Sequence, residues 1–455
     1  MTLTETAPAT AEGNDKEATP APVPEPTPAV EEIVTTEVVE DILKSHNADL
    51  DLLDFSARLG SQLGDNYMSI MYAVDINAKS RTTGIAEVFH IMLKTLPRNN
   101  FRQQMINEMK AFEKESKMYG EVFEDFIAFQ KEKGLEDGEM FSAFPKCYSS
   151  FCNGTTDYLA MEDLRYSGYK MGNRIAGLDE DHSKLAVMNL AKFHAVSFAM
   201  FQGDYNKILE KYPFLEERMF KKPEDLEPMY KAYTQQTFVT EGEALRKAGL
   251  VKEAERVEGV YDEDFHCRLR RLAGDEVKWA VIGHGDCWTN NMLFTYDDVT
   301  GKPLEHKFLD FQISRASSRT IDLNYFIYSS LPMKDLNTRE NSLLRLYHDT
   351  FTHFAAKLGY SNEELTFENL LQEMDEFRPY GIIMGLLLAP ILSADKDAVP
   401  DLETMDFKPD NAADSVELTK EFYAEMMKSD LLTLKLTNIA QNHIPRCKTW
   451  NKEQN

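Results

Sequence analysis

The sequence predicts an α+β protein of two lobes, the first built on an antiparallel sheet and one long helix, the second mainly helical. Two apolar runs typical of strands lie at residues 68–76 and 85–96, with turn-forming residues between them. Large apolar residues then recur at helical spacing over residues 100–130. The helical pattern that follows is interrupted between residues 280 and 314, where polar loop residues and two short apolar runs predict a hairpin.

Composition excludes several classes of protein. The chain has 455 residues, and 76 acidic against 50 basic side chains give a net charge of −26, which argues against general binding of nucleic acid. Hydrophobic residues make up 43%, enough for a packed core of one large or two ordinary domains. The five cysteines are scattered and none form a C-x-x-C pair, which argues against a disulfide framework or a structural zinc site.

The first 43 residues differ from the rest. Proline alternates there with Ala, Thr and Glu, and residues 1–45 hold ten acidic and two basic side chains, a local charge of −8. Such a segment buries too little apolar surface to offset its ordering entropy. We therefore expect a disordered tail over residues 1–43.

The sequence shows no sign of secretion or membrane insertion. The N-terminus lacks a basic segment followed by an apolar one. The most apolar stretch, residues 379–394, is too short to span a bilayer and carries a proline, so it predicts a buried helix. We expect a cytoplasmic protein without a membrane partner.

Lys94 is an ammonium in the otherwise apolar strand run of residues 85–96. Burying it would be costly without a partner. Glu108 and Glu115, seven residues apart on the helix that follows, lie on one helical face, so periodicity does not choose between them. The alternative is an edge-strand lysine that reaches solvent.

The predicted hairpin gathers three polar side chains. The pattern H-G-D-x-W-x-x-N places Asp286 and Asn291 in one loop, and the hairpin brings Asp310 back beside them. Phosphoryl transfer needs a carboxylate to take the acceptor proton and metal to neutralise the phosphate oxygens. Asp286 can serve as the base, and Asn291 and Asp310 supply the oxygen ligands that Mg²⁺ prefers. Taken singly, each acid could instead cap a turn.

These residues resemble the ecdysteroid kinase-like family, also called CHK-kinase-like, within the protein-kinase-like and aminoglycoside-phosphotransferase-like superfamily. The resemblance covers roughly residues 54–400. It is carried by nine segments in order, at residues 64–69, 92–97, 112–119, 145–148, 161–164, 191–197, 284–294, 309–312 and 322–325.

The resemblance implies a two-lobed protein-kinase-like fold, with an N-lobe over residues 44–163 and a C-lobe over residues 164–455. It also implies ATP and Mg²⁺ as cofactors, and a role for each matched residue. Asp286 would be the base, His284 would brace its loop, and Asn291 and Asp310 would hold the metal. Lys94 would contact the nucleotide phosphates, with Glu115 as its partner through the family's E-x-x-M-Y helix signature. Adenine would bind at a hinge, and a loop would cover the phosphates. The hinge residues would be Glu162, Asp163 and Leu164, and the loop residues Gly64, Asn66 and Ser69. Asp322 would tie a C-lobe helix to the catalytic loop.

The resemblance also implies the acceptor, a hydroxylated small molecule such as an ecdysteroid or a xenobiotic. Two alternatives stay open. A choline or aminoglycoside kinase would need an aromatic or acidic box for its amine, to which Trp288 and Tyr325 could contribute. A catalytically inactive kinase-like binding protein would have lost part of the base, lysine and metal set, all of which this sequence retains.

Overall fold

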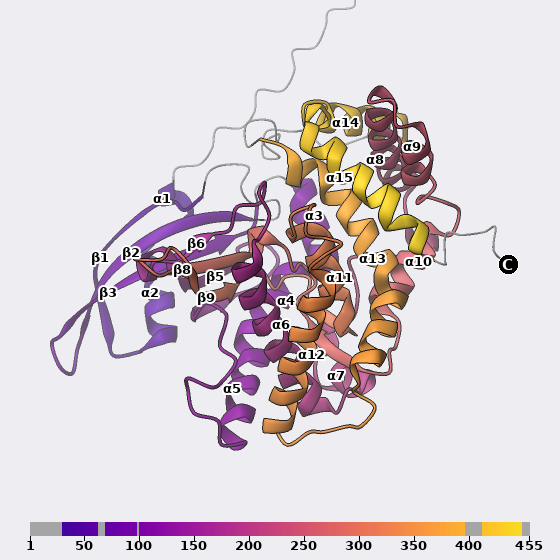
Figure 1. Ribbon diagram of the computed structural model, residues 1–455. Helices are drawn as coiled ribbons and strands as arrows, with labels where there is room; N and C mark the ends of the chain where they lie inside the picture. Colours follow the sequence, from indigo (N-terminus) through magenta and orange to yellow (C-terminus); the bar gives the residue numbers. More distant parts are fainter. Residues whose placement is uncertain (1–29, 62–68, 98–99, 396–411, 448–455) are drawn as a thin grey trace, which may run out of the picture.

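The structure, a computed structural model, describes residues 30–61, 69–97, 100–395 and 412–447. A sheet-bearing lobe lies at the left of Figure 1 and a larger helical lobe at the right. This arrangement confirms the predicted α+β fold class, with an antiparallel N-terminal sheet and a mainly helical C-terminal part.

The N-lobe sheet has five antiparallel strands in the order β1-β2-β3-β5-β4. The strands are β1 (Leu50–Leu59), β2 (Ile70–Ser80), β3 (Ala86–Thr95), β4 (Cys147–Phe151) and β5 (Tyr158–Glu162). The strands expected at 68–76 and 85–96 are confirmed as β2 and β3. Lys94 lies on β3 in the middle of the sheet, so its alternative interpretation as an edge-strand lysine is wrong.

The two faces of the sheet have different partners because side chains alternate along each strand. One face carries Tyr72, Val74, Ile91 and Leu93, which share a hydrophobic core with helix α2 (Thr36–His46). The opposite face of β3 carries Lys94 and faces the C-lobe.

The disordered tail predicted over residues 1–43 extends too far, because residues 36–43 belong to helix α2. The described chain is helical from α1 (Val30–Ile33) onward, and α2 buries Val39, Ile42 and Leu43. These three residues recur at the spacing of one helical face, and the Thr35 side chain accepts a hydrogen bond from the backbone of Val38. This short amphipathic pattern was hidden by the proline-rich, acidic composition around it. Residues 1–29 lie outside the described residues.

The helix expected over residues 100–130 is present as a series of helical segments. They are α3 (Asn100–Met109), α4 (Ala111–Lys117), one π-helical turn (Met118–Val122) and α5 (Phe123–Glu132). Lys110, with a left-handed φ of 54°, separates α3 from α4. The break allows α4 to set its own direction toward the sheet.

The predicted hairpin is confirmed by strands β8 (Met292–Tyr296) and β9 (Pro303–Phe308). Strand β6 (Lys170–Met171) pairs with β8, while β7 (Ala280–Gly283) pairs with β10 (Arg315–Ser318). The backbone N–H of Leu309 donates to Asn291 O at 2.9 Å, so the two ends of the hairpin meet. The loops after β7 and after β9 are therefore neighbours.

The C-lobe is made of packed helices. They are α6 (Glu180–Phe201), α7 (Tyr205–Lys211), α8 (Pro228–Lys247), α9 (Val251–Glu258), α10 (Phe265–Gly274), α11 (Arg319–Ser330), α12 (Glu340–Lys357), α13 (Phe367–Ser393), α14 (Ala412–Tyr423) and α15 (Asp430–Asn442). The buried helix expected at 379–394 is confirmed as the second half of α13. A Cβ on Gly381 would lie 2.7 Å from Asn324 Cβ, so the glycine permits close packing of α13 on α11.

None of the helices in the described part of the chain combines the length and the apolarity that crossing a membrane requires.

Candidate active site

Lys94 joins the two lobes through a pair of carboxylates. Its Nζ lies 2.6 Å from Glu115 Oε2 on α4 and 2.9 Å from Asp310 Oδ1, which is 216 residues downstream. Burial lowers the pKa of Lys94, but the charges of Asp310 and Glu115 outweigh it and hold this pKa above its usual value. The ammonium therefore stays charged. The other candidate partner, Glu108, pairs with Lys221 at the surface.

The loop after β7 takes a shape that requires glycine at position 285. Gly285 has a φ of +86°, and a Cβ there would lie 2.2 Å from Ile313 O. Beside it, His284 Nδ1 accepts a hydrogen bond from the backbone of Asp286 at 3.2 Å, and its Nε2 lies 3.0 Å from Leu309 O. Burial lowers the pKa of His284, so the neutral ring can accept at one nitrogen and donate at the other. His284 thus links the Asp286 loop to the residue before Asp310.

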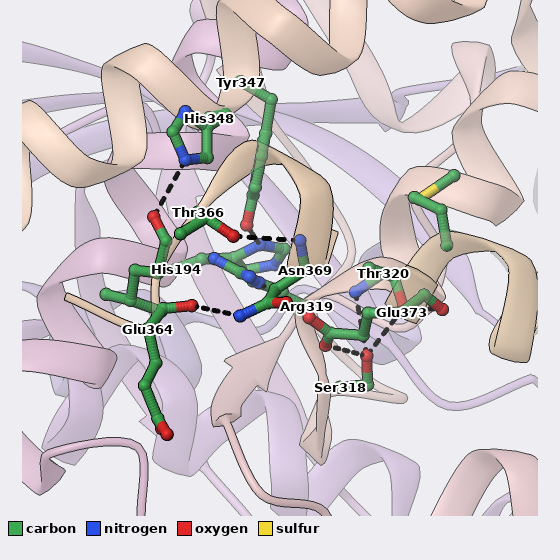
Figure 2. Close-up of polar contacts among 12 residues, drawn as sticks. His194, Ser318, Arg319, Thr320, Tyr347, His348, Glu364, Thr366, Asn369 and Glu373 are labelled. Carbon is green, nitrogen blue, oxygen red and sulfur yellow. Dashed lines mark hydrogen bonds and ion pairs between the residues drawn. The ribbon is translucent and has the colours of Figure 1, made fainter. Parts of the chain in front are cut away.

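Asp322 on α11 holds the same loop from the other side. Its carboxylate accepts hydrogen bonds from the backbone of His284 at 2.6 Å and of Gly285 at 2.9 Å. His194 Nε2 lies 3.0 Å from Asp322, and His194 Nδ1 lies 2.8 Å from the Tyr347 hydroxyl. The contact between His194 and Tyr347 is drawn in Figure 2. Burial opposes ionisation of Asp322, yet the His194 contact outweighs it and lowers the pKa. Asp322 therefore ties a C-lobe helix to the loop that carries Asp286, as the sequence predicts.

The start of α11 is itself anchored to α13. Figure 2 shows Arg319 and Ser318 bound to Glu373, with Arg319 Nε and Ser318 Oγ 3.0 and 2.6 Å from its carboxylate oxygens. Arg319 is fully buried. The helix that carries Asp322 is thus fixed within the C-lobe independently of its contact with the loop.

Asp286 has a hydrogen-bond donor at each carboxylate oxygen. The Tyr325 hydroxyl donates to Oδ1 at 2.6 Å, and Asn291 Nδ2 donates to Oδ2 at 2.8 Å. Burial and the nearby charge of Asp310 raise the pKa of Asp286 to about 6, although the Tyr325 and Asn291 bonds oppose the shift. The group remains mainly ionised at neutral pH and can accept a proton.

Asp310 follows β9 in a left-handed backbone conformation, with a φ of 66°. Gln312 Nε2 donates to its Oδ2 at 3.0 Å while Lys94 occupies Oδ1. The amide nitrogen of Asn291 donates hydrogen bonds to Asp286, so the amide oxygen remains available to bind a metal.

This oxygen set fits magnesium. Within the described residues, no group of three or more His, Cys, Asp or Glu side chains could hold a metal by itself. Mg²⁺ commonly binds one or two protein oxygens and completes its shell with phosphate and water. Asn291 and Asp310 would hold the ion, which would neutralise charge on the nucleotide phosphates.

The three residues expected at the hinge lie at the end of β5 and directly after it. The backbone N–H of Glu162 donates to Lys146 O and that of Asp163 to His90 O, both at 2.9 Å. Leu164 is the first residue of a short 3₁₀ helix (Leu164–Ser167), where a backbone N–H has no intrahelical acceptor. Leu164 is therefore the residue of the three whose N–H can meet a ligand.

The structure describes only one of the three residues expected over the phosphates. Ser69 is buried at the start of β2, with its Oγ 4.0 Å from Met71 Sδ. Gly64 and Asn66 lie outside the described residues.

Three side chains of this site were missed or given another role from sequence. Tyr325 contacts the base itself, whereas the sequence suggested only an amine box for it. It lies three residues after Asp322 on α11, a spacing that places both on one helical face and could have indicated the contact. His194 acts on Asp322 through a tertiary contact, for which the sequence carries no signal. Gln312 contacts Asp310, which lies only two residues before it.

The fold and the site define a small-molecule kinase-like protein. The family model described as the ecdysteroid kinase-like family matches residues 63–360, and the chain belongs to that family. No curated protein sequence matches this chain.

Several solved structures are similar in fold. Choline kinase from Cryptosporidium parvum is 10% identical, with 87% of this chain and 96% of that chain covered and a TM-score of 0.37. Ethanolamine kinase from Plasmodium vivax is 13% identical, with 89% and 99% covered and a TM-score of 0.36. A GDP complex of aminoglycoside 2'-phosphotransferase-IIIa is 12% identical, with 85% and 98% covered and a TM-score of 0.31. At TM-scores this low we draw no conclusion about function from these neighbours.

Proposed function

We propose that this protein is an ATP-dependent kinase that phosphorylates an alcohol group of a small molecule. The observation that supports it most is the buried Lys94 in contact with both Glu115 and Asp310, beside the loop that carries Asp286. The acceptor class, an ecdysteroid or a similarly hydroxylated compound such as a xenobiotic, rests on the family membership.

In the proposed reaction, the acceptor oxygen attacks the γ-phosphorus of ATP. A bond forms between that oxygen and phosphorus, the bond to the ADP oxygen breaks, and the acceptor proton passes to Asp286. Lys94 holds the nucleotide phosphates, and Glu115 keeps the ammonium in place. His284 and Asp322 fix the loop that aims the base.

The surroundings of Tyr325 favour an uncharged acceptor over a quaternary amine. The Tyr325 ring lies 6.4 Å from that of Tyr380, whose face is already covered by the guanidinium of Arg315 at 5.5 Å. Arg315 also pairs with Glu217 at 3.1 Å, so the charge of this carboxylate is neutralised. An amine brought here would meet a fixed positive charge rather than a free aromatic face. Trp288 is buried and belongs to the core.

We propose that the protein acts in the cytoplasm on small molecules, without a nucleic-acid or membrane partner. The net charge of −26 supports this, because it opposes association with polyanions.

The direct test is ADP release with Mg²⁺ and ATP across a panel of acceptors. The panel holds ecdysteroids, hydroxylated xenobiotics, choline, ethanolamine and an aminoglycoside. We expect acceptor-dependent turnover with a hydroxylated neutral compound, and loss of at least about 100-fold in Asp286→Asn, because general-base catalysis contributes on the order of 10²–10⁴-fold.

The variant should keep its circular dichroism spectrum and its unfolding midpoint. A protein that binds panel members but consumes no ATP, with Asp286→Asn behaving identically, would instead be a kinase-like binding protein. Turnover confined to choline or the aminoglycoside would reject the proposed acceptor class but not the kinase activity.

A further inference from the structure

We propose that Arg165 is a nucleotide-binding residue, whose fixed guanidinium plane stacks on the purine ring of ATP. The proposal rests on the nucleotide-dependent function proposed above. Arg165 directly follows the expected hinge residues and lies outside the segments that carry the family resemblance.

The guanidinium of Arg165 is held in one orientation by a buried carboxylate. Its Nε donates to Asp163 Oδ1 at 2.8 Å and its Nη2 to Asp163 Oδ2 at 2.5 Å. The Asp163 side chain is only 2% exposed, so this carboxylate is part of the fold rather than a surface group. Two parallel bonds of this kind fix the plane of an arginine as well as its position.

The same guanidinium reaches across to the strand that precedes the phosphate loop. Arg165 Nη1 donates to Gly60 O at 3.0 Å, at the end of β1, and Nη2 lies 3.2 Å from Met92 Sδ on β3. Gly60 is close to the same methionine, because a Cβ there would lie 2.7 Å from Met92 Cε. The Arg165 side chain nevertheless remains 49% exposed. A guanidinium held in one plane, on a side chain that stays half-exposed, is a ready platform for a flat ligand.

This platform lies where the base of a nucleotide would fall if Lys94 holds its phosphates. Met92 precedes Lys94 by two residues on β3, so both side chains point to the same face of the sheet. Met92 is also directly opposite Met161 on β5, the residue before the hinge. The path from Lys94 along β3 toward the hinge therefore runs past Met92, and Arg165 is in contact with it.

The chemistry of this arrangement favours a purine. A planar, delocalised cation is attracted to the face of an aromatic ring, and a guanidinium stacks on such faces. A two-ring base offers more of that face than a one-ring base does. We therefore expect the protein to prefer ATP and GTP over CTP and UTP at equal phosphate number and equal metal.

Calorimetric titration of the full chain with ATP, ADP and inorganic tripolyphosphate tests the proposal. In Arg165→Met and Arg165→Lys, we expect the affinity for ATP and ADP to fall about 3- to 30-fold, the range of a cation–π contact, and the affinity for tripolyphosphate to stay unchanged. The lysine variant keeps the charge but lacks the planar fork, so it should lose as much as the methionine variant.

Arg81→Met is the matched control. Arg81 is also about half-exposed and paired with a carboxylate, Asp51 at 3.2 Å. It follows β2, at the opposite end of β3 from Lys94, so its replacement should leave ATP affinity unchanged. The preference of the wild-type protein for ATP over UTP is a second readout. It does not depend on whether a variant folds.

The proposal is overturned if Arg165→Met binds ATP as tightly as the wild type or more tightly, since the latter would make Arg165 an obstacle. An equal loss for tripolyphosphate would also reject stacking, and so would equal wild-type affinity for ATP and UTP. A wild-type protein that binds no nucleotide would reject the proposed kinase function itself, an outcome distinct from the others.

Discussion

At the scale of single residues, Asp286, the base of the proposed reaction, shows how the chain orients one side chain. Asp286 accepts one hydrogen bond from Tyr325 and one from Asn291. Only one of these donors comes from its own loop; the other lies on α11. The orientation of the carboxylate therefore depends on how α11 is anchored, and not only on the H-G-D-x-W-x-x-N pattern.

Removing the Tyr325 hydroxyl should slow phosphoryl transfer without weakening ATP binding. In Tyr325→Phe, Asp286 Oδ1 loses its 2.6 Å donor and the carboxylate can rotate away from the acceptor. A hydrogen bond to a charged group is worth about 1.5–3 kcal/mol, so we expect kcat to fall about 10- to 100-fold. Steady-state kinetics with varied ATP should show an unchanged KM for ATP.

Tyr328→Phe is a suitable control, because Tyr328 lies one turn further on α11 and its hydroxyl contacts His443 and Arg378 instead. It should change stability but not kcat. A Tyr325→Phe variant with normal kcat and a changed acceptor KM would make Tyr325 part of the acceptor wall and not a support for the base.

At the scale of elements, helix α8 buries an acid that nothing in the described chain pairs. Glu241 is fully buried, and neither of its carboxylate oxygens accepts a hydrogen bond from a described residue. Burial alone raises the pKa of Glu241 well above its usual value. The helix thus carries a carboxyl group that the folded state keeps protonated.

This group should make the protein less stable as pH rises. The folded state holds a proton on Glu241 that the unfolded chain releases above its usual pKa of 4.5, so the free energy of unfolding falls as pH increases beyond that value. In Glu241→Gln this contribution is absent. Urea unfolding should therefore show little difference between variant and wild type at pH 5, and a variant more stable by about 2 kcal/mol at pH 8.

Glu243→Gln provides the control, because Glu243 is exposed on the same helix and should leave the pH dependence of wild type intact. Parallel stability curves for wild type and Glu241→Gln between pH 5 and 8 would show that Glu241 is ionised or paired in solution.

At the scale of the whole molecule, the sequence predicts residues whose positions follow from local patterns. It does not predict contacts between residues that are distant in the chain. The hairpin and its polar side chains Asp286, Asn291 and Asp310 were predictable, because turn chemistry and strand patterns bring these three together. Lys94 stood out as an ammonium in an otherwise apolar strand run, but its contact with Asp310 spans 216 residues. Glu115 needed the family signature, since Glu108 shares its helical face.

Other features could not be predicted, for physical reasons. The edge strand β1 is largely exposed and lacks a clean alternation of apolar residues, so its sequence does not stand out. The contact of Arg165 with Gly60 joins residues 105 positions apart, and it forms only when the sheet has folded. Contacts of this kind depend on tertiary geometry, which local patterns do not encode.

The distribution of the core leads to a prediction about how the molecule opens. The sheet and α2 share one hydrophobic core, whereas α4 and α5 belong to the larger core of the C-lobe. Phe123 on α5 lies edge-on to Phe311 at 4.8 Å, and Phe126 lies 5.9 Å from Phe193 on α6. In energetic terms the long helix thus belongs with the C-lobe, although in sequence it is part of the N-lobe.

Native-state hydrogen exchange in increasing urea should therefore separate the sheet from the long helix. We expect amides of β1 and α2 to exchange at lower urea than those of α5, and α5 to exchange together with α6, because cooperative units follow shared cores. Phe123→Ala should destabilise by about 3–5 kcal/mol and shift α5 and α6 together while leaving α2 little changed. Exchange of α5 in step with β2 and β3 would contradict this division. It would mean that the N-lobe opens as one body and takes Glu115 away from the C-lobe together with Lys94.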